Sequence, residues 1–197
     1  MKASLLLLAL LLTMVCCHET ELQKSVFLPD KDAPGLPLYS EWGYNTFGAY
    51  YDLIAFISNS TTVPAKLIIK ENKLSLVFTG YRSGSYSNPG DFSMTITMPQ
   101  AGLSSYKDLI TLNKTVFDLT DPKYEIIFLD GTIGTKAQIL NGTFEIKRAQ
   151  YLLVDMKAEE VILSGVFEFQ ALVNGIPITV SSGRFDVGVS SNNFYKL

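Results

Sequence analysis

The stretch "AKLIIKENKLSLVF", residues 65–78, decides the fold class of this chain. If Glu71 and Asn72 form a two-residue loop, every second side chain is apolar on both arms and the apolar positions face one another. The facing pairs are Ile69 with Leu74, Leu67 with Leu76, and Ala65 with Phe78. Alternation of period two that stays in register across a turn predicts a β-hairpin with one buried face.

A second hairpin is predicted in "VILSGVFEFQALVNGIPITVSSGRFDVGV", residues 161–189, because Asn174-Gly175 is a strong type I′ turn signal. Counting back from this turn places Ile178 opposite Ala171 and Val180 opposite Phe169. The later apolar residues have the wrong parity for this register, so we predict a β-bulge at Ser182-Gly183, with the glycine in the bulge. Such a bulge turns Arg184 and Asp186 to the outer face. There Glu168, diagonal to Arg184, is expected to join them in a cross-strand ion network.

Shorter strand-like segments fill the rest of the chain and are separated by Gly, Pro, Asn and Asp. They cover residues 92–98, 114–119, 124–129, 137–149 and 150–156, and residues 99–112 allow one short helical turn. About ten strands without interleaved helices predict a single all-β domain over residues 41–197. The expected architecture is an antiparallel β-sandwich, with a β-barrel as the alternative.

The first sixteen residues have the pattern of an export signal, with Lys2 followed by an eleven-residue apolar run, residues 5–15. This run is shorter than the ~18–20 residues that span a bilayer. The two cysteines of the chain, Cys16 and Cys17, follow it directly. Cys17 fits a lipoprotein acylation site, with Met14 at −3 and a compact residue at −1, and Cys16 is the alternative acceptor. Both thiols can also be explained as small apolar residues that end the leader.

Residues 17–40 are charged and contain three prolines, which favour an extended tether. The alternative is that residues 25–28, "SVFL", form a first edge strand. An acylated Cys17 at the start of this tether would hold the domain at a membrane. The sequence therefore predicts a membrane-anchored lipoprotein of the bacterial cell envelope, with the outer membrane as its expected location.

Most common catalytic and cofactor-binding patterns are missing from the sequence. The one histidine, His18, lies in the tether, so no metal site or catalytic triad built on histidine is expected in the domain. Sixteen Lys and Arg against nineteen Asp and Glu, without clusters, give no sign of nucleic-acid binding, and no cofactor is expected. The carboxylates that a glycoside hydrolase would need could come from Asp155, Glu159, Glu160 and Glu168.

Aromatic residues offer a different kind of site. Residues 39–51 contain six of them, among which Trp42 and Phe47 are interpreted as core. The loop at residues 80–91 combines rings with polar groups that suit stacking on a sugar or anchoring a protein. Its candidate ligand-binding residues are Tyr81, Arg82, Tyr86 and Asn88.

Three stretches resemble a group of exported lipoproteins from Bacteroidota that carry a domain of unknown function. They are "NTFGAYYD" at 45–52, "SYKDLITLN" at 105–113, and "LSGVFEFQA" with "SSGRFDV" at 163–171 and 181–187. The most specific part, interpreted as structural, consists of Gly165, Phe167, Phe169, Gly183, Arg184, Phe185 and Asp186. The resemblance implies an envelope lipoprotein with an all-β domain and carries no known activity.

Together these observations predict an anchored, non-catalytic β domain that binds a glycan or a protein partner. The alternatives are a carboxylate-dependent glycan hydrolase and a structural component of the envelope.

Overall fold

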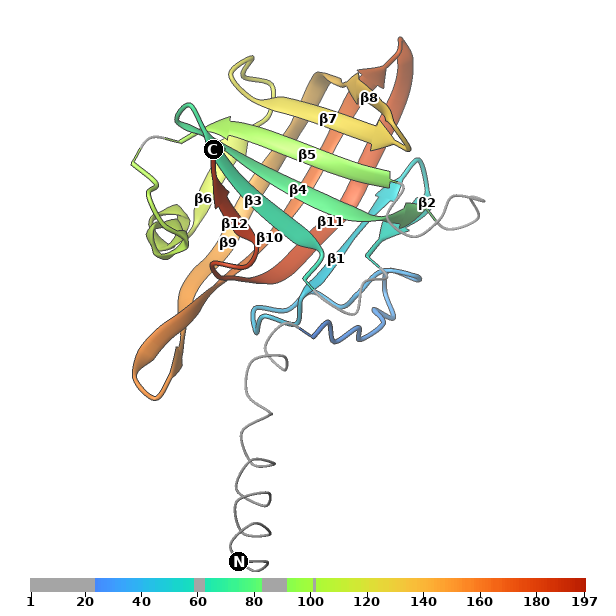
Figure 1. Cartoon of the computed structure of the whole chain (residues 1–197). Coiled ribbons are helices and arrows are strands. Elements are labelled where there is room, and N and C mark those ends of the chain that lie inside the picture. Colours follow the sequence, from blue (N-terminus) through green and yellow to red (C-terminus); the bar gives the residue numbers. More distant parts are fainter. Residues whose placement is uncertain (1–23, 59–62, 83–91, 101) are drawn as a thin grey trace, which may run out of the picture.

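The computed structural model describes residues 24–58, 63–82, 92–100 and 102–197, which form an almost entirely β structure (Figure 1). The strands are β1 (Thr46–Tyr51), β2 (Ile54–Ile57), β3 (Ala65–Lys70), β4 (Lys73–Arg82), β5 (Phe92–Pro99), β6 (Thr115–Asp118), β7 (Glu125–Asp130), β8 (Ile133–Lys136), β9 (Gln138–Val154), β10 (Lys157–Val173), β11 (Ile176–Val189) and β12 (Phe194–Lys196). One short 3-10 helix, η1 (Tyr106–Leu112), lies at the position allowed for a helical turn.

The strands join into one sheet in the order β6-β9-β10-β11-β1-β2-β4-β5-β7-β8, with β3 paired to β4 and β12. All pairs among these described strands are antiparallel except β12 with β3, and the sheet is not closed. The prediction of an all-β, sandwich-like antiparallel fold is therefore confirmed. The segments predicted as strands did not include β1, β2, β8 or β12.

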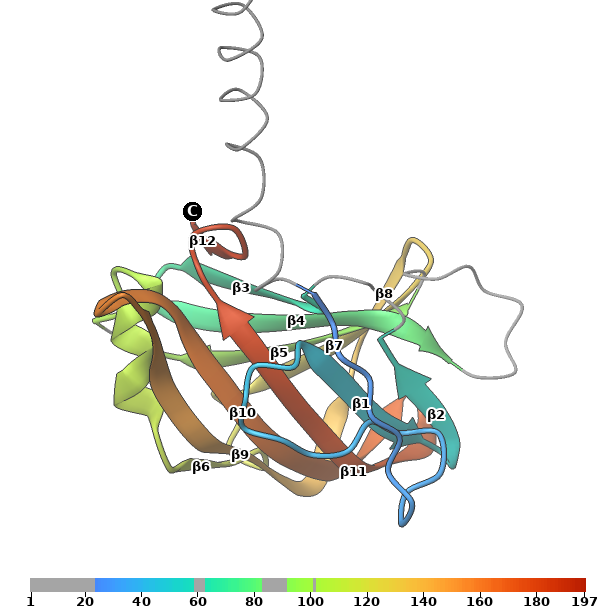
Figure 2. The same cartoon turned by 90° about the horizontal axis from the view of Figure 1, so that it is seen from below.

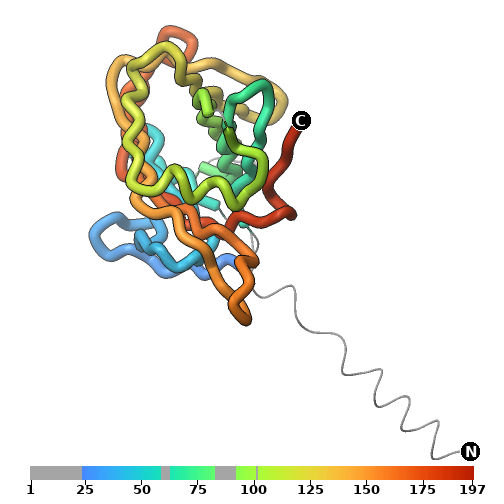
Figure 3. Tube along the Cα trace, turned by 90° about the vertical axis from the view of Figure 1, so that its left-hand side faces the viewer, coloured from blue at the N-terminus to red at the C-terminus, as the bar shows by residue number. Residues whose placement is uncertain are grey.

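The sheet curls so that its two halves face one another (Figure 3). Phenylalanine rings fill the space between the two halves. Phe78 of β4 stacks on Phe47 of β1, with ring centroids 4.6 Å apart. It also contacts Phe185 of β11 at 5.3 Å, and Phe185 stacks on Phe144 of β9 at the same distance. Ring contacts of this kind stabilise a core beyond the burial of their area, so the aromatic cluster links the two halves.

The first predicted hairpin is confirmed residue by residue. In β3 and β4, Ile69 pairs with Leu74, Leu67 with Leu76, and Ala65 with Phe78. Glu71 and Asn72 have φ angles of 51° and 59°, the positive values that a type I′ turn requires at both central residues.

The register of the second hairpin is also confirmed, because Ala171 pairs with Ile178 and Phe169 with Val180. A bulge lies next to the predicted position, where the ladder shifts between Phe167 and Phe169. The residue in the left-handed conformation is Ser182, with φ 52°, and not Gly183 as expected. Gly183 is required for another reason: a Cβ there would lie 2.4 Å from the Phe167 ring.

The longest hairpin, β9 with β10, is formed by two 17-residue strands. Residues 137–149 and 150–156 were predicted as separate strands, but β9 runs through both. Its turn consists of Asp155 and Met156, with φ angles of 48° and 65° and no glycine. The last residue of β11 paired with β10 is Val189, opposite Val161. Residues 152–160 therefore extend past the end of β11 as a two-stranded projection, which we call the arm (Figure 1).

Residues 24–44 cross the outer face of the sheet, over β10, β11 and β1, and we call this segment the strap (Figure 2). Pro29 and Pro37 form an isolated bridge, and Leu36 is fully buried. Residues 24–40, expected to be part of an extended tether, thus lie against the sheet as part of the strap, and residues 25–28 form no strand. Residues 17–23 lie outside the described residues. Within the described part of the chain, no helix has the length and hydropathy needed to cross a membrane.

Candidate functional site

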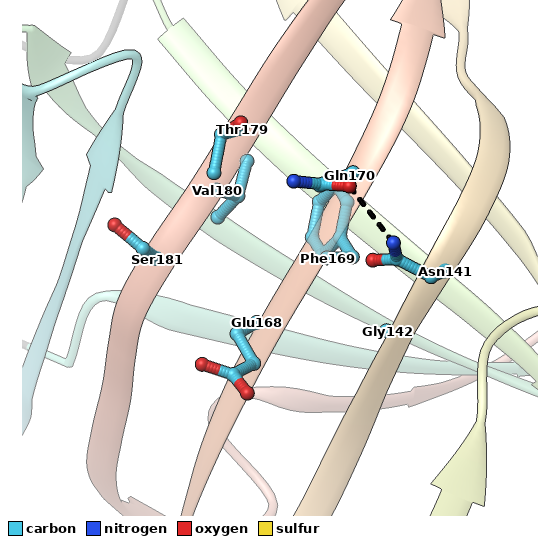
Figure 4. Close-up of a pocket in the computed structure, with 8 residues that line it drawn as sticks. All are labelled: Asn141, Gly142, Glu168, Phe169, Gln170, Thr179, Val180 and Ser181. Carbon is cyan, nitrogen blue, oxygen red and sulfur yellow. Dashed lines mark hydrogen bonds between the residues drawn. The ribbon is translucent and has the colours of Figure 1, made fainter.

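A shallow hollow of about 250 Å³ opens on the outer face of β9, β10 and β11 (Figure 4). Its lining residues are Asn141, Gly142, Glu168, Phe169, Gln170, Thr179, Val180 and Ser181. The apolar Phe169 and Val180 belong to the core, whereas the polar side chains alternate with them along each strand and point outward. The period-two pattern that builds the core thus also gathers hydrogen-bonding groups on the opposite face.

Two backbone irregularities shape the hollow. Gly142 has a φ of 135°, and a Cβ at this position would lie 2.3 Å from the Cβ of Phe169 and 2.4 Å from the carbonyl oxygen of Glu168. Only glycine allows β9 to approach β10 this closely. On the other side of β10, the β11 bulge places Ser181 and Ser182 opposite Glu168. The hollow therefore lies between a glycine contact and a bulge.

The polar groups of the hollow are only partly engaged with one another. The amide of Asn141 donates a hydrogen bond of 2.8 Å to the side-chain oxygen of Gln170, which leaves the other half of each amide free to bind a ligand. Glu168 is exposed and forms no ion pair among the described residues. Asp52 fixes β11 beside the hollow, accepting a 2.7 Å hydrogen bond from the Thr179 backbone N–H. The site offers amide, hydroxyl and carboxylate groups on a rigid sheet.

The predicted ion network of Glu168, Arg184 and Asp186 is wrong, because the strap provides the partners of both outer-face residues in β11. Arg184 forms an ion pair with Asp30 of the strap, and both side chains are largely buried. Asp186 is 1% exposed and also binds the strap. The contacts join residues more than 140 positions apart, so no local pattern could indicate them.

Asp186 forms the central attachment point of the strap. Its carboxylate accepts hydrogen bonds from three successive backbone N–H groups, those of Trp42 at 3.1 Å, Gly43 at 2.9 Å and Tyr44 at 3.0 Å. The hydroxyl of Ser40 also donates to it. Four donors around one carboxylate satisfy a charge that would otherwise be costly to bury. This arrangement is structural.

Beside Asp186, burial raises the pKa of the Tyr39 hydroxyl, and the carboxylate of Glu41, which accepts its hydrogen bond at 3.0 Å, raises it further. Tyr39 therefore stays protonated and serves as a hydrogen-bond donor within the strap.

Trp42 differs from the prediction that it belongs to the core. Phe47 is buried as expected, but the Trp42 side chain is 73% exposed. The reason is that Asp186 holds the backbone of Trp42 against the outer face of the sheet, so its ring cannot reach the core inside.

The predicted ligand-binding loop is only partly described. Arg82 forms an ion pair of 2.6 Å with Asp130, and its guanidinium group lies 4.5 Å from the centroid of the Phe92 ring. These contacts give Arg82 a role in holding β4 and β7 together. Tyr81 is half-buried beside it, and Tyr86 and Asn88 lie outside the described residues.

The candidate carboxylates of a hydrolase are spread along the sheet. Glu160 is buried at the base of the arm, where burial, and then Glu159, raise the pKa of its carboxyl group. Glu168 is eight residues further along the same strand, a distance of about 27 Å at ~3.4 Å per residue. Glycoside hydrolysis requires two carboxyl groups ~5–9.5 Å apart, so Glu160 and Glu168 cannot form such a pair. Asp155, at the tip of the arm, is further still from Glu168.

The motif residues of β10 and β11 occupy structural positions. The rings of Phe167, Phe169 and Phe185 lie in the core, and a Cβ on Gly165 would lie 2.1 Å from the carbonyl oxygen of Glu145. Across the described ranges, no group of three or more His, Cys, Asp or Glu side chains is placed to hold a metal ion. No protein-family model, curated protein or solved structure matches this chain, so the chemistry of its own side chains is what bears on its function.

Proposed function

We propose that this chain is an exported bacterial lipoprotein, acylated at Cys17, whose β domain binds a glycan without catalysis at the hollow on β9, β10 and β11. The observation that carries the proposal is the set of hydrogen-bonding side chains around the hollow, which are Asn141, Glu168, Gln170, Thr179 and Ser181.

Sugar hydroxyls both donate and accept hydrogen bonds, and this set offers both functions at short range. The paired amides of Asn141 and Gln170 can donate and accept, and Glu168 can accept two donors. The volume of about 250 Å³ is below the ~300–1,000 Å³ of sites for drug-sized ligands, which suits one sugar ring or the end of a chain. The three paired strands that carry these groups hold them in place before the ligand arrives.

Binding is favoured over hydrolysis by the composition of the hollow. Of its eight described lining residues, Glu168 is the one with a carboxylate. A glycosidase would need a second carboxyl group nearby to act as its nucleophile or base.

The location rests on the leader and on Cys17. An apolar run too short to span a bilayer, followed directly by cysteine, supports export and acylation. We expect the Cys17→Ser variant to move from the membrane fraction to the soluble fraction, and continued membrane partitioning would refute this choice of acceptor.

The binding proposal is tested with the full chain on a glycan array, followed by calorimetry with the strongest ligand. Gln170→Ala and Glu168→Gln should each weaken binding by about tenfold, since a hydrogen bond to a charged or paired polar group contributes ~1.5 kcal/mol. Lys70→Ala, which replaces an exposed residue of β3, is the control and should bind the glycan as tightly as the wild type does. Absence of any glycan ligand, or equal binding by all variants, would contradict the proposal. A protein recovered in pull-downs in place of a glycan would support a protein partner.

A further inference from the structure

Three large apolar side chains are exposed at one end of the molecule. On the arm, Leu153 is 55% exposed and Met156, in the turn, is 89% exposed. Trp42, the single tryptophan of the chain, is held beside the base of the arm, because the backbone oxygen of the adjacent Glu41 accepts a 3.1 Å hydrogen bond from Gln150 of β9. Single exposed apolar side chains such as Leu53 occur elsewhere on the surface, and it is the grouping of Trp42 with Leu153 and Met156 that makes this end a candidate for contact with a partner or a membrane.

This end is also where the described chain begins. The backbone oxygen of Lys24 accepts a 3.2 Å hydrogen bond from the side chain of Asn45. The side-chain oxygen of Asn45 in turn accepts a 2.8 Å hydrogen bond from the N–H of Gly188, next to the last residue of β11. Lys24 therefore lies close to the point where the arm leaves the sheet, and Figures 1 and 3 both show the start of the described chain and the arm at the same end.

If Cys17 is acylated, the length of chain between Cys17 and Lys24 limits how far this end of the domain can lie from the membrane. Cys17 and Lys24 are seven residues apart, which span at most ~25 Å when fully extended. From Val161 to the end of the arm at Lys157 is four residues, or about 14 Å at ~3.4 Å per residue. An arm of that length bridges more than half of the greatest possible gap between the sheet and the bilayer.

The chemistry of the arm suits a shallow contact with lipid. In the arm, β9 and β10 pair with each other up to Val154 and Lys157, with a shift in the ladder between Ala158 and Glu160. The outward-facing N–H and C=O groups of both strands have no partner among the described strands, so they must stay at headgroup level, where water binds them, and only side chains can enter the apolar layer. Trp is enriched at headgroup level, and Leu and Met can enter the acyl boundary. Exposed Lys157 can bind an anionic headgroup, while the exposed carboxylates of Asp155 and Glu159 limit the depth of insertion.

We propose that the arm is a second membrane contact, through which Leu153 and Met156 dock the domain on the lipid surface that holds Cys17. This inference rests on the proposed acylation, and its partner is the lipid surface itself. Docking at two points fixes the orientation of the sheet and keeps the hollow, which lies further along β10, away from the bilayer.

The test places a fluorescent label at the tip of the arm in the acylated full chain. In a mature chain that begins at acylated Cys17, Met156→Cys provides the one free thiol, which carries an environment-sensitive fluorophore. Leu53→Cys is the matched control, because Leu53 is 90% exposed in the β1–β2 turn. It lies toward the far end of the sheet, where Tyr51 pairs with Val180. Each protein is reconstituted into vesicles of phosphatidylethanolamine and phosphatidylglycerol.

We expect nitroxide-labelled lipid to quench the label at position 156 several-fold more than iodide does, and the reverse at position 53. Adding Leu153→Glu should remove the lipid quenching at 156. An iodide-accessible label at 156 in a chain whose intact mass includes acyl groups would overturn the docking proposal and leave the anchor standing. A label protected from both quenchers would point to contact with a second protein copy and would also overturn it. An unacylated chain would overturn both proposals.

Discussion

Replacing Asp186 by alanine tests how the strap is held to the sheet. The change removes the acceptor of three backbone N–H groups and of the Ser40 hydroxyl. Hydrogen bonds to a charged group contribute ~1.5–3 kcal/mol each, so four would sum to about 6–12 kcal/mol. The strap can detach and let water satisfy the four donors, however, which limits the loss to about 4 kcal/mol. For a domain of this size, that loss corresponds to a fall in Tm of about 8–16 °C.

The assay combines thermal unfolding with hydrogen exchange of the strap amides. In Asp186→Ala, the N–H groups of Trp42, Gly43 and Tyr44 should lose protection while the amides of β10 keep theirs. Asp186→Asn, which keeps one acceptor oxygen, should lose about half as much stability. Glu71→Gln, an exposed carboxyl in the β3–β4 turn, is the control and should leave Tm unchanged. A fall of less than about 2 °C in Asp186→Ala, with strap protection intact, would refute this account of the strap.

Further predictions concern strand packing, the bulge and one buried acid. Gly165→Ala should lower the free energy of unfolding, measured by chemical denaturation, by about 3 kcal/mol, because the new Cβ would lie 2.1 Å from a backbone oxygen. Gly134→Ala is the control and should change the free energy of unfolding little, because no atom would lie closer than 3.8 Å to its new Cβ. Ser182→Gly should raise stability by about 0.5–1 kcal/mol in the same assay, because Ser182 has a positive φ that glycine adopts without strain. The raised pKa of Glu160 means that the folded state holds its proton more tightly than the unfolded state, so its contribution to stability is full below the ordinary value of 4.5 and is lost as pH rises through the raised pKa. Glu160→Gln should therefore be more stable than the wild type at neutral pH and equal to it in acid; an advantage that grows in acid would contradict this sign.

The two hairpins around Glu71-Asn72 and Asn174-Gly175 could be predicted to the residue because their signals are local. Side-chain alternation selects the face, and a turn with positive φ at both central positions sets the register. The Asp155-Met156 turn has the same geometry without a glycine or asparagine, so it carried no such signal and the long arm was missed.

The strap and the hollow could not be predicted in the same way, because they arise from contacts between distant segments. The strap depends on Asp186, and nothing near Trp42 in the sequence reveals that its backbone is bound there and its ring excluded from the core. One signal for the hollow was available: Gly142 interrupts an otherwise strand-like segment, and a glycine inside a strand often marks the close approach of another backbone. Asn141, directly before this glycine, is one of the residues that line the hollow.

The intact mass of the native protein, purified from membranes, shows whether the chain is acylated. We expect a polypeptide that begins at Cys17 and carries fatty acyl groups. An unmodified chain that begins after both cysteines would contradict this expectation, and with it the proposal that this β domain works at a membrane surface.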